Sequence, residues 1–318
     1  MPSLDNLRLK TSARRKNMPL TPGCDDISSN RSIGTVVGAE AQHSCHRKRE
    51  LVIGGIPITA LSPVEWAELM VQDCRANTDR SAIPKFMTSA NGFVLSLYAR
   101  DPEFKKLLDQ ADGIDADGMP LVLVSRMLAR APLPERVATT DFFHVAARFA
   151  ERTDISFFFL GSTEEDNRVA VERVRATYPR LQIAGRHHGH FTDAEEAAVV
   201  QQIATAKPDV LWVGMGVPRE HQFIVHNRIR LTGVSWIKSC GGLFKFLSGK
   251  DRRAPRWMQE LCLEWIFRLA REPQRLFMRY YRSNGHAIYL MCKHRALTRH
   301  TSSGMAPGAG QVTRLFSG

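Results

Sequence analysis

The chain has 318 residues, 43% of them hydrophobic, and carries a formal net charge of +12 with a pI near 9.7. This length and apolar fraction allow a substantial core, in one large domain with appendages or in two small domains. The charge predicts an anionic partner, for which a nucleic acid, a phosphorylated substrate and an acidic membrane all qualify. No apolar run approaches the roughly 20 residues that span a bilayer, and the N-terminus lacks the apolar segment of a secretory signal. We therefore expect a protein that is soluble or lies on a membrane without crossing it.

Cysteine and histidine patterns do not indicate a metal site. The six cysteines are scattered, without a CxxC pair or a His/Cys spacing suited to zinc, as expected for buried thiols of a cytoplasmic protein. His187, His188 and His190 cluster in one stretch, but no carboxylate lies at ligand spacing from them. No GxSxG elbow or catalytic cysteine signature is present, so hydrolysis through a covalent nucleophile is not supported.

Composition divides the chain into four segments. Residues 1–48 are rich in Ser, Asn, Gly and basic residues without a helical or strand period, and we expect a disordered basic arm. Residues 49–248 are expected to form the core, 249–292 a basic amphipathic helical appendage, and 293–318 a flexible tail. The arm could contact anionic lipid or nucleic acid, or could be a solvated tail without a specific role.

From Leu51 onward, short apolar segments alternate with amphipathic segments of helical period. Residues 51–58 are predicted to form a strand broken by a turn, and Ser62-Pro63 begins a helix. Further strands are predicted at 85–89, 113–116, 155–160, 181–185, 210–214 and 234–239. Helices are predicted at 92–98, 102–110, 119–128, 164–178, 194–206 and 219–230. This alternation predicts an α/β fold with a Rossmann-like, largely parallel sheet and helices on both faces.

Asp117 follows one of these predicted strands, within the sequence ADGIDADG at 111–118. A carboxylate at the C-terminal end of a strand points into the crevice where open α/β sheets bind ligands. Asp and Gly are also common in surface turns, so the octapeptide alone leaves both interpretations open.

Polar and glycine turns follow two other predicted strands. Ser89 and Asn91 place a hydroxyl and a carboxamide at a strand-to-helix turn, which suits a phosphate or a sugar hydroxyl and equally suits a plain helix cap. The turn at Gly161 is not a GxGxxG, so a dinucleotide fingerprint is not supported.

A third turn, at 213–220, carries two glycines. Gly214 and Gly216 allow a ligand to approach the backbone closely. Arg219 and Glu220 are expected to present a cation and a carboxylate at the rim. Several such turns at the ends of parallel strands favour one shared crevice.

The last third of the chain is strongly basic. Residues 238–282 hold eleven Lys and Arg against four Asp and Glu. Arginines recur at steps of three and four from Arg268 to Arg282, and form one cationic stripe if the helix persists past Pro273. Aromatic residues are interleaved with them, a composition typical of surfaces that lie on anionic membranes. A basic helical pair packed on the domain, or an RNA-binding surface, would have a similar composition.

Short motifs follow one another in a characteristic order. They are SAN at 89–91, RDPEF at 100–104, ADGIDADGM at 111–119, PERV at 134–137, FLG at 159–161, HGHF at 188–191, GMGVPR at 214–219, RAPRWM at 253–258 and LEW at 263–265. In this order the chain resembles the WecG/TagA/CpsF glycosyltransferases of bacterial envelope polysaccharide synthesis. The resemblance spans about residues 50–282 and leaves both ends of the chain unexplained.

The resemblance implies roles for single residues. The aspartate of the family's DG pair falls on Asp117 and is its proposed general base. The Thr-x-Asn motif falls on Ser89 and Asn91, and a substrate-contacting arginine falls on Arg136. The implied substrate-binding set is Ser89, Asn91, Arg136, Asp141, Gly216, Glu220 and Arg253.

The resemblance also implies a reaction. Family members transfer a sugar, with inversion, from a UDP-sugar donor to a polyprenyl-diphosphate-linked sugar acceptor, without an essential metal or other cofactor. The basic C-terminal segment would dock on the anionic cytoplasmic face of the inner membrane, as in a peripheral protein with no nucleic-acid partner. Glucose is the favoured donor because exopolysaccharide members use it, although no residue here selects it. The sequence leaves open whether the chain forms a homo-oligomer.

Two other classes stay open from the residues alone. A non-enzymatic protein that binds nucleic acid or an anionic surface would explain the charge, but not the polar turns after successive strands. Another nucleotide-dependent transferase on a Rossmann-like sheet would explain those turns.

Two departures from the family pattern, and one incidental motif, bear on the site. Glu220 stands where the family usually has Gln, so a group that could donate hydrogen bonds is lost. Thr139 stands where a glycine is usual. Asp115-Ala116-Asp117 spells DxD, the metal–diphosphate motif of a different transferase class, which the family resemblance argues against and the sequence leaves open.

Overall fold

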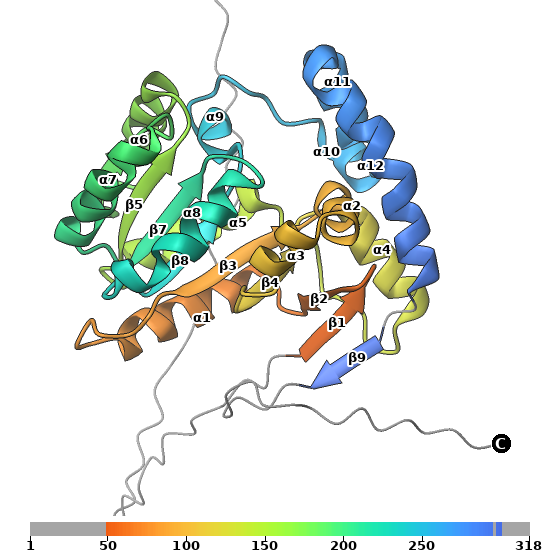
Figure 1. Ribbon diagram of the computed structural model, residues 1–318, viewed down its shortest axis with the longest axis horizontal. Coiled ribbons are helices and arrows are strands. Elements are labelled where there is room, and N and C mark those ends of the chain that lie inside the picture. The colour runs from red at the N-terminus through yellow and green to blue at the C-terminus, as the bar shows by residue number, and fades with distance from the viewer. Residues whose placement is uncertain (1–48, 295–296, 301–318) are drawn as a thin grey trace, which may run out of the picture. The chain divides into compact units, whose positions relative to one another are not determined.

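A six-stranded parallel sheet lies at the centre of the structure, a computed structural model that describes residues 49–294 and 297–300 (Figure 1). Its strand order is β4-β3-β8-β7-β5-β6, and every neighbouring pair is parallel. The strands are β3 (Lys85–Ala90), β4 (Gly113–Ala116), β5 (Ser156–Gly161), β6 (Gln182–His187), β7 (Val210–Gly214) and β8 (Trp236–Ser239). All strand C-terminal ends therefore meet at one edge.

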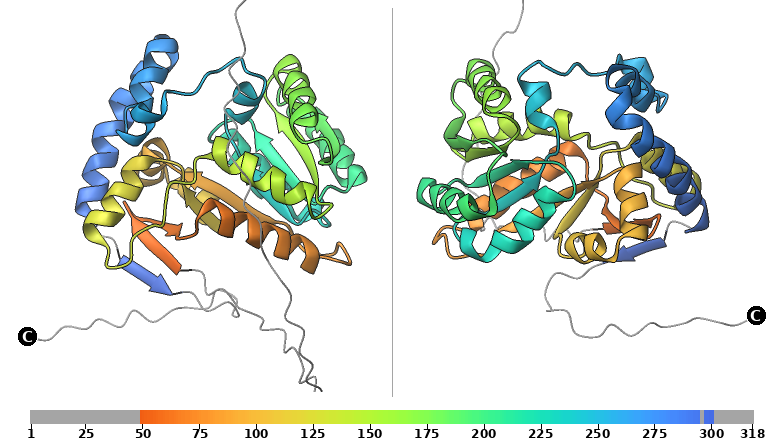
Figure 2. Two further views of the ribbon diagram at one scale, coloured as in Figure 1. Left: turned by 180° about the vertical axis from the view of Figure 1, so that it is seen from behind. Right: turned by 45° about the horizontal axis from the view of Figure 1, so that its top comes forward.

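Helices cover both faces of this sheet (Figure 2). One face packs against α1, α5, α6 and α9, and the other against α7 and α8. The helices of this part of the chain are α1 (Pro63–Ala76), α2 (Gly92–Arg100), α3 (Pro102–Leu108), α4 (Met119–Leu128), α5 (Thr139–Glu151), α6 (Glu164–Thr177), α7 (Asp193–Ala206), α8 (Arg219–Asn227), the 3-10 turn η1 (Arg228–Leu231) and α9 (Leu243–Leu247). The predicted α/β class is confirmed. The prediction missed α5 and α9.

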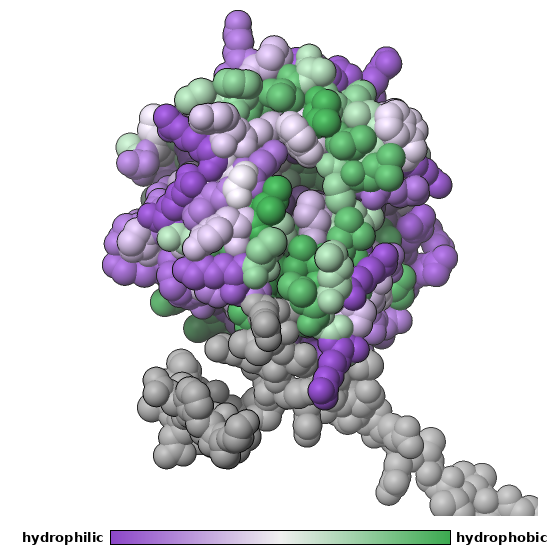
Figure 3. All heavy atoms as spheres, turned by 90° about the vertical axis from the view of Figure 1, so that its right-hand side faces the viewer, coloured by the Kyte–Doolittle hydropathy of each residue, from purple (hydrophilic) through white to green (hydrophobic). Residues whose placement is uncertain are grey.

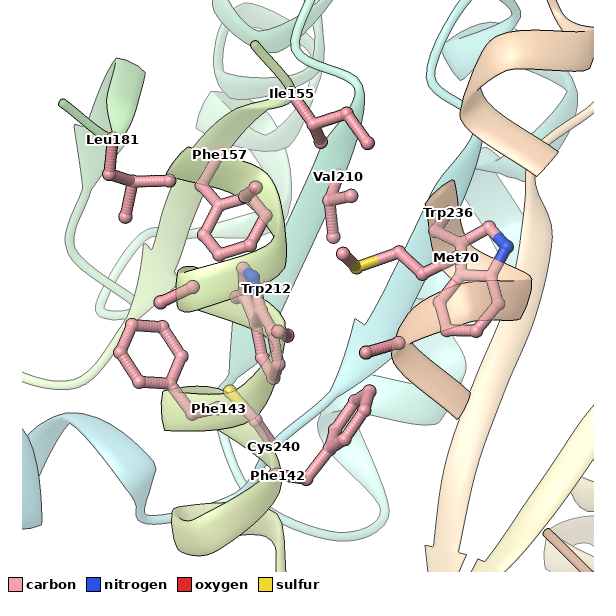
Figure 4. Close-up of a cluster of buried hydrophobic side chains, with 14 of the residues drawn as sticks. Met70, Phe142, Phe143, Ile155, Phe157, Leu181, Val210, Trp212, Trp236 and Cys240 are labelled. Carbon is pink, nitrogen blue, oxygen red and sulfur yellow. The ribbon is translucent and has the colours of Figure 1, made fainter. Parts of the chain in front are cut away.

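The core is dense in aromatic rings on the face that carries α5 (Figure 4). Phe143 of α5 meets Trp212 of β7 edge to face, with ring centroids 5.1 Å apart. The ring centroids of Phe157 of β5 and of the same indole are 5.7 Å apart. Strands buried on both faces are almost continuously apolar, and β5 and β7 are buried at every position. This rigid centre fixes where the loops beyond the strands begin.

A smaller sheet flanks the main one. It has the order β2-β1-β9 and contains β1 (Arg49–Ile53), β2 (Ile56–Thr59) and β9 (Leu297–His300). The predicted strand broken by a turn is the β1–β2 hairpin. β9 was not predicted, because it falls in the segment expected to be a flexible tail. The basic arm at 1–48 lies outside the described residues.

The C-terminal appendage is three helices rather than one long one: α10 (Arg256–Glu260), α11 (Glu264–Arg271) and α12 (Pro273–Lys293). The condition for one continuous cationic stripe, a helix that persists past Pro273, is not met. Proline has no backbone N–H and its ring disfavours a helical residue before it, so it starts a new helix. The arginines are thereby divided between α11 and α12. No helix within residues 49–294 is both long and apolar enough to cross a membrane.

The longest of these helices, α12, is part of the folded body. It packs on α2, where the Arg279 guanidinium lies 3.8 Å from the centre of the Phe93 ring and Ser96 Oγ lies 3.0 Å from His286 Nδ1. Ala287 is buried in the apolar cluster shared with α2, α4 and the β1–β2 hairpin. Removing the appendage would therefore expose part of the core.

Candidate active site

Asp117 lies immediately after β4, among the first residues of three helices. Its backbone N–H donates to the Ala90 carbonyl at 2.9 Å, and its Oδ1 accepts the backbone N–H of Thr139, the first residue of α5, at 3.3 Å. Gly118 is the N-cap of α4 and Asn91 the N-cap of α2. Helix N-termini carry partial positive charge and free N–H groups, so this corner of the sheet favours anions.

Arg136 contacts both the backbone and the side chain of Asp117. Its Nε donates to the Asp117 backbone carbonyl at 2.6 Å, and its Nη2 lies 3.9 Å from Asp117 Oδ1 and 2.8 Å from Glu264 Oε2. Burial, the largest single effect, lowers the pKa of Arg136, but the carboxylates of Asp117, Glu264 and Asp141 together raise it above its ordinary value. The Arg136 side chain is 15% exposed, so it is largely but not completely shielded from solvent.

Arg253 joins this group from the segment before α10. It pairs with Asp141 of α5, donates to Gln259 Oε1 at 2.6 Å, and places its Nε 4.0 Å from Glu264 Oε1. The structure thus brings Asp117, Arg136, Asp141 and Arg253 together, as expected. Glu264 was not predicted as a site residue. Its only sequence signal was membership of the LEW motif.

A buried ion pair lies beneath this group. Lys238 Nζ is 2.8 Å from Asp115 Oδ2, and the two side chains are 1% and 4% exposed. Lys238 also donates to Ser89 Oγ at 2.7 Å, and Ser89 Oγ lies 3.2 Å from Thr139 Oγ1. Burial raises the pKa of Asp115, and Lys238 acts in the opposite direction. Because Asp115 is engaged with an ammonium in the interior, it is poorly placed to share a cation with Asp117.

Asn91 has the geometry of a helix cap. Its Oδ1 accepts the backbone N–H groups of Phe93 and Val94 at 3.1 and 3.2 Å. The cap interpretation is thus confirmed, and a contact with substrate stays a prediction. Among residues 49–294, no three His, Cys, Asp or Glu side chains are grouped so that they could hold a metal ion.

Glu220 is not at the rim, where it was predicted to be. It is 2% exposed, and its Oε2 accepts the N–H groups of Gly216 and Gly241, each at 3.0 Å. The carboxylate thereby ties together the loops that follow β7 and β8. Burial raises its pKa to about 7. The side chain points inward because backbone donors from two loops are available there, which spacing along the chain cannot reveal.

Arg219 does lie at the surface, as predicted. It donates to the Phe191 carbonyl at 2.6 Å and lies over the Phe191 ring. A cavity of about 540 Å³ opens beside this pair at the C-terminal edge of the sheet, and Met215, Pro218 and Gln222 contribute to its lining. The glycine turn after β7 therefore does border an open space.

Comparison with known proteins shows the family to which the chain belongs. A sequence model described as the Glycosyl transferase WecG/TagA/CpsF family matches residues 51–301. An N-acetylglucosaminyldiphosphoundecaprenol N-acetyl-beta-D-mannosaminyltransferase from Bacillus spizizenii is 31% identical over 190 residues, which cover 60% of this chain and 72% of the relative. The protein of the same name from Bacillus subtilis is 33% identical over 176 residues, covering 55% and 67%.

Among solved structures, a nicotinate phosphoribosyltransferase from Vibrio cholerae aligns with 60% of this chain and 49% of its own. Its identity of 14% and TM-score of 0.19 are too low to support an inference. The family match covers most of the chain and contains the whole arrangement around Asp117. The resemblance drawn from the motifs is confirmed, and the chain belongs to the WecG/TagA/CpsF family of glycosyltransferases.

Proposed function

We propose that this glycosyltransferase moves a sugar from a UDP-sugar to a polyprenyl-diphosphate-linked saccharide, with inversion, and that Asp117 is the general base. The names of the Bacillus relatives describe transfer of an N-acetylmannosaminyl group to a sugar on diphosphoundecaprenol. A lipid-diphosphate acceptor of that class fits a basic, partly apolar protein. The pathway would be the synthesis of exopolysaccharide or another cell-envelope polysaccharide.

The observation that carries the proposal is the setting of Asp117. Its side chain is 28% exposed and lies at the C-terminal edge of a parallel sheet, where such sheets bind ligands, with Arg136 beside it. In the transfer, the acceptor hydroxyl oxygen bonds to the anomeric carbon while the bond from that carbon to the diphosphate oxygen breaks. Asp117 takes the hydroxyl proton, and UDP departs from the opposite face with the bonding electron pair. One displacement inverts the anomeric centre.

Positive groups near Asp117 would stabilise the departing UDP. Arg136 and Arg253 supply guanidinium groups, and the first turns of α4 and α5 add backbone dipoles. Fixed cations of this kind act most strongly where they are partly shielded from water. They would serve in place of the divalent metal that DxD transferases use.

A transfer assay with defined donors tests the reaction. Purified protein is incubated with N-acetylglucosaminyl-diphospho-undecaprenol and, separately, with UDP-glucose, UDP-galactose, UDP-N-acetylmannosamine and UDP-uronic acids. We expect one donor to give a product whose new linkage has the opposite anomeric configuration from the donor, read by NMR. Glucose is the first donor to try, and the buried Glu220 in place of the family's usual Gln is a reason to test beyond the relatives' N-acetylmannosaminyl group. A product with retained configuration would refute the single displacement.

The appendage is proposed to hold the enzyme on an anionic membrane. Large apolar side chains are exposed along its three helices and just after α10, and Figure 3 shows hydrophobic residues gathered beside hydrophilic ones on this side of the molecule. They are Trp257, Leu261, Trp265, Ile266, Phe277, Met278, Tyr281, Ile288 and Tyr289. None of α11 is buried, so its apolar residues are available to a partner. Aromatic and aliphatic side chains mixed with arginines suit the headgroup region of an anionic bilayer.

Vesicle binding tests this docking. Phe277 and Tyr281 are 56% and 76% exposed and their rings stack on each other, so the double variant Phe277→Ser, Tyr281→Ser should fold normally. We expect it to lose most of its binding to phosphatidylglycerol vesicles in a sedimentation assay. Ile229→Ser, an equally exposed residue in η1, is the control and should bind as the wild type does. Unchanged binding of the double variant, or a preference for oligonucleotide over vesicles, would contradict the proposal.

A further inference from the structure

Glu264 lies between two arginines and links the appendage to the site. Its Oε2 is 2.8 Å from Arg136 Nη2, and its Oε1 is 4.0 Å from Arg253 Nε. Carboxylates and guanidiniums alternate from Asp117 through Arg136, Glu264 and Arg253 to Asp141. The two arginines thus share one counter-ion, supplied by the first residue of α11.

The partial burial of these three side chains strengthens the effect of the Glu264 charge. The side chains of Arg136, Arg253 and Glu264 are only 15%, 21% and 20% exposed, so water screens them incompletely. Two guanidinium groups held close together in such a place repel each other, and a carboxylate between them offsets this repulsion. Burial already disfavours the charged form of Arg136, and nearby carboxylates compensate for it.

Glu264 also competes with Asp117 for Arg136. The guanidinium Nη2 is 2.8 Å from Glu264 but 3.9 Å from Asp117 Oδ1. Without the Glu264 charge, the nearest remaining anion for Nη2 is the Asp117 carboxylate. A direct Arg136–Asp117 pair would turn the guanidinium away from the ligand and occupy the oxygen that is to accept a proton.

We propose that Glu264 is a positioning residue, which holds Arg136 and Arg253 side by side for the diphosphate of the donor and keeps Arg136 off the carboxylate of Asp117. The inference rests on the proposed function for the identity of the ligand. It adds a role for α11: Glu264, the first residue of this helix, pairs with Arg136 and so joins the helix to the site, beside the contact that Arg253 makes with Gln259 of α10. Seating of the appendage and arrangement of the arginines are thereby coupled.

The test compares Glu264→Gln, Glu264→Asp and the control Glu260→Gln. Glu260 lies on the same appendage, in α10, and its side chain is exposed, so its substitution removes the same charge outside the arginine pair. Calorimetry or competition measures the affinity for UDP and for uridine, which has no phosphate. We expect Glu264→Gln to weaken UDP about tenfold, as for loss of one charge-assisted contact, and to leave uridine unchanged. Glu264→Asp should recover part of the UDP affinity, and Glu260→Gln should behave as wild type.

A merely structural role would give a different pattern. It would weaken UDP and uridine equally and lower the unfolding temperature, and that result would overturn the inference. Unchanged or tighter UDP binding by Glu264→Gln would also overturn it, the latter by showing that Glu264 obstructs the diphosphate. Because binding of UDP needs no turnover, failure of Asp117 as the base would leave this result standing, so the two proposals fail separately.

Discussion

Glu220→Gln should make the protein's stability less dependent on pH. The carboxylate is 2% exposed and burial raises its pKa to about 7, from an ordinary 4.5. The folded state therefore binds this proton more tightly than the unfolded state does. Stability contributed by the protonated group is fully present below about pH 4.5 and is lost as the pH rises through about 7. The amide oxygen of a glutamine can accept the same two backbone N–H groups but does not titrate.

The size of the effect follows from the two pKa values. At about 1.4 kcal/mol for each pH unit between them, ionising Glu220 removes about 3 kcal/mol of unfolding free energy between acidic and alkaline pH. For a domain of this size that corresponds to roughly 10 °C in the unfolding temperature. The variant should therefore gain stability relative to the wild type as the pH is raised from 5 to 9.

Thermal unfolding followed by circular dichroism at several pH values measures this. Glu68→Gln is the control, because Glu68 is an exposed residue on α1 and its substitution makes the same chemical change at the surface. The reasoning is refuted if the wild type and Glu220→Gln keep a constant difference in unfolding temperature across the pH range.

Two further predictions concern the buried Lys238–Asp115 ion pair and whether transfer needs a divalent metal. Lys238→Met leaves Asp115 buried without its cation and should cost about 3 kcal/mol or more. The loss should grow with pH, because Asp115 can escape it only by taking up a proton. Lys106→Met, which breaks a pair that is 71% and 78% exposed, should have no measurable effect on the unfolding temperature, and equal effects of the two variants would contradict the argument. Transfer should survive EDTA, because Asp115 is engaged with Lys238 and guanidinium groups stand near Asp117; activity abolished by EDTA and restored by manganese would reverse that view.

Much of the sheet was predictable because β4, β5, β7 and β8 are buried at every position. Such strands appear as short continuous apolar runs, and the segment that became β5 is an example. The helix α5 was missed for a local reason. Its N-cap position is Ala138, which has no side chain to cap the first turn, and the carboxylate that accepts the Thr139 N–H comes from Asp117, 22 residues earlier, so the usual local start signal is absent. Pro273 gave a usable signal, because it is the first residue of α12 and the helix before it ends at Arg271.

The site was predictable only in part. Residues inside short motifs, such as Asp117 and Arg136, could be named, because the motif order indicated the family. Their partners could not be named from spacing, since Arg136 and Glu264 are 128 residues apart and Lys238 and Asp115 are 123 apart. Such pairs depend on which strands and helices become neighbours, which is a property of the folded chain.

The initial rate of transfer by Asp117→Asn tests the central claim most directly. The measurement uses the preferred donor, the lipid-diphosphate acceptor and saturating vesicles, with Asp154→Asn as the control. Asp154 is exposed and precedes β5 at the opposite edge of the sheet. We expect Asp117→Asn to lose a factor of about 100 to 10,000 in kcat, with an unfolding temperature near that of the wild type, while Asp154→Asn keeps full activity. Near-normal turnover by a folded Asp117→Asn would contradict the account.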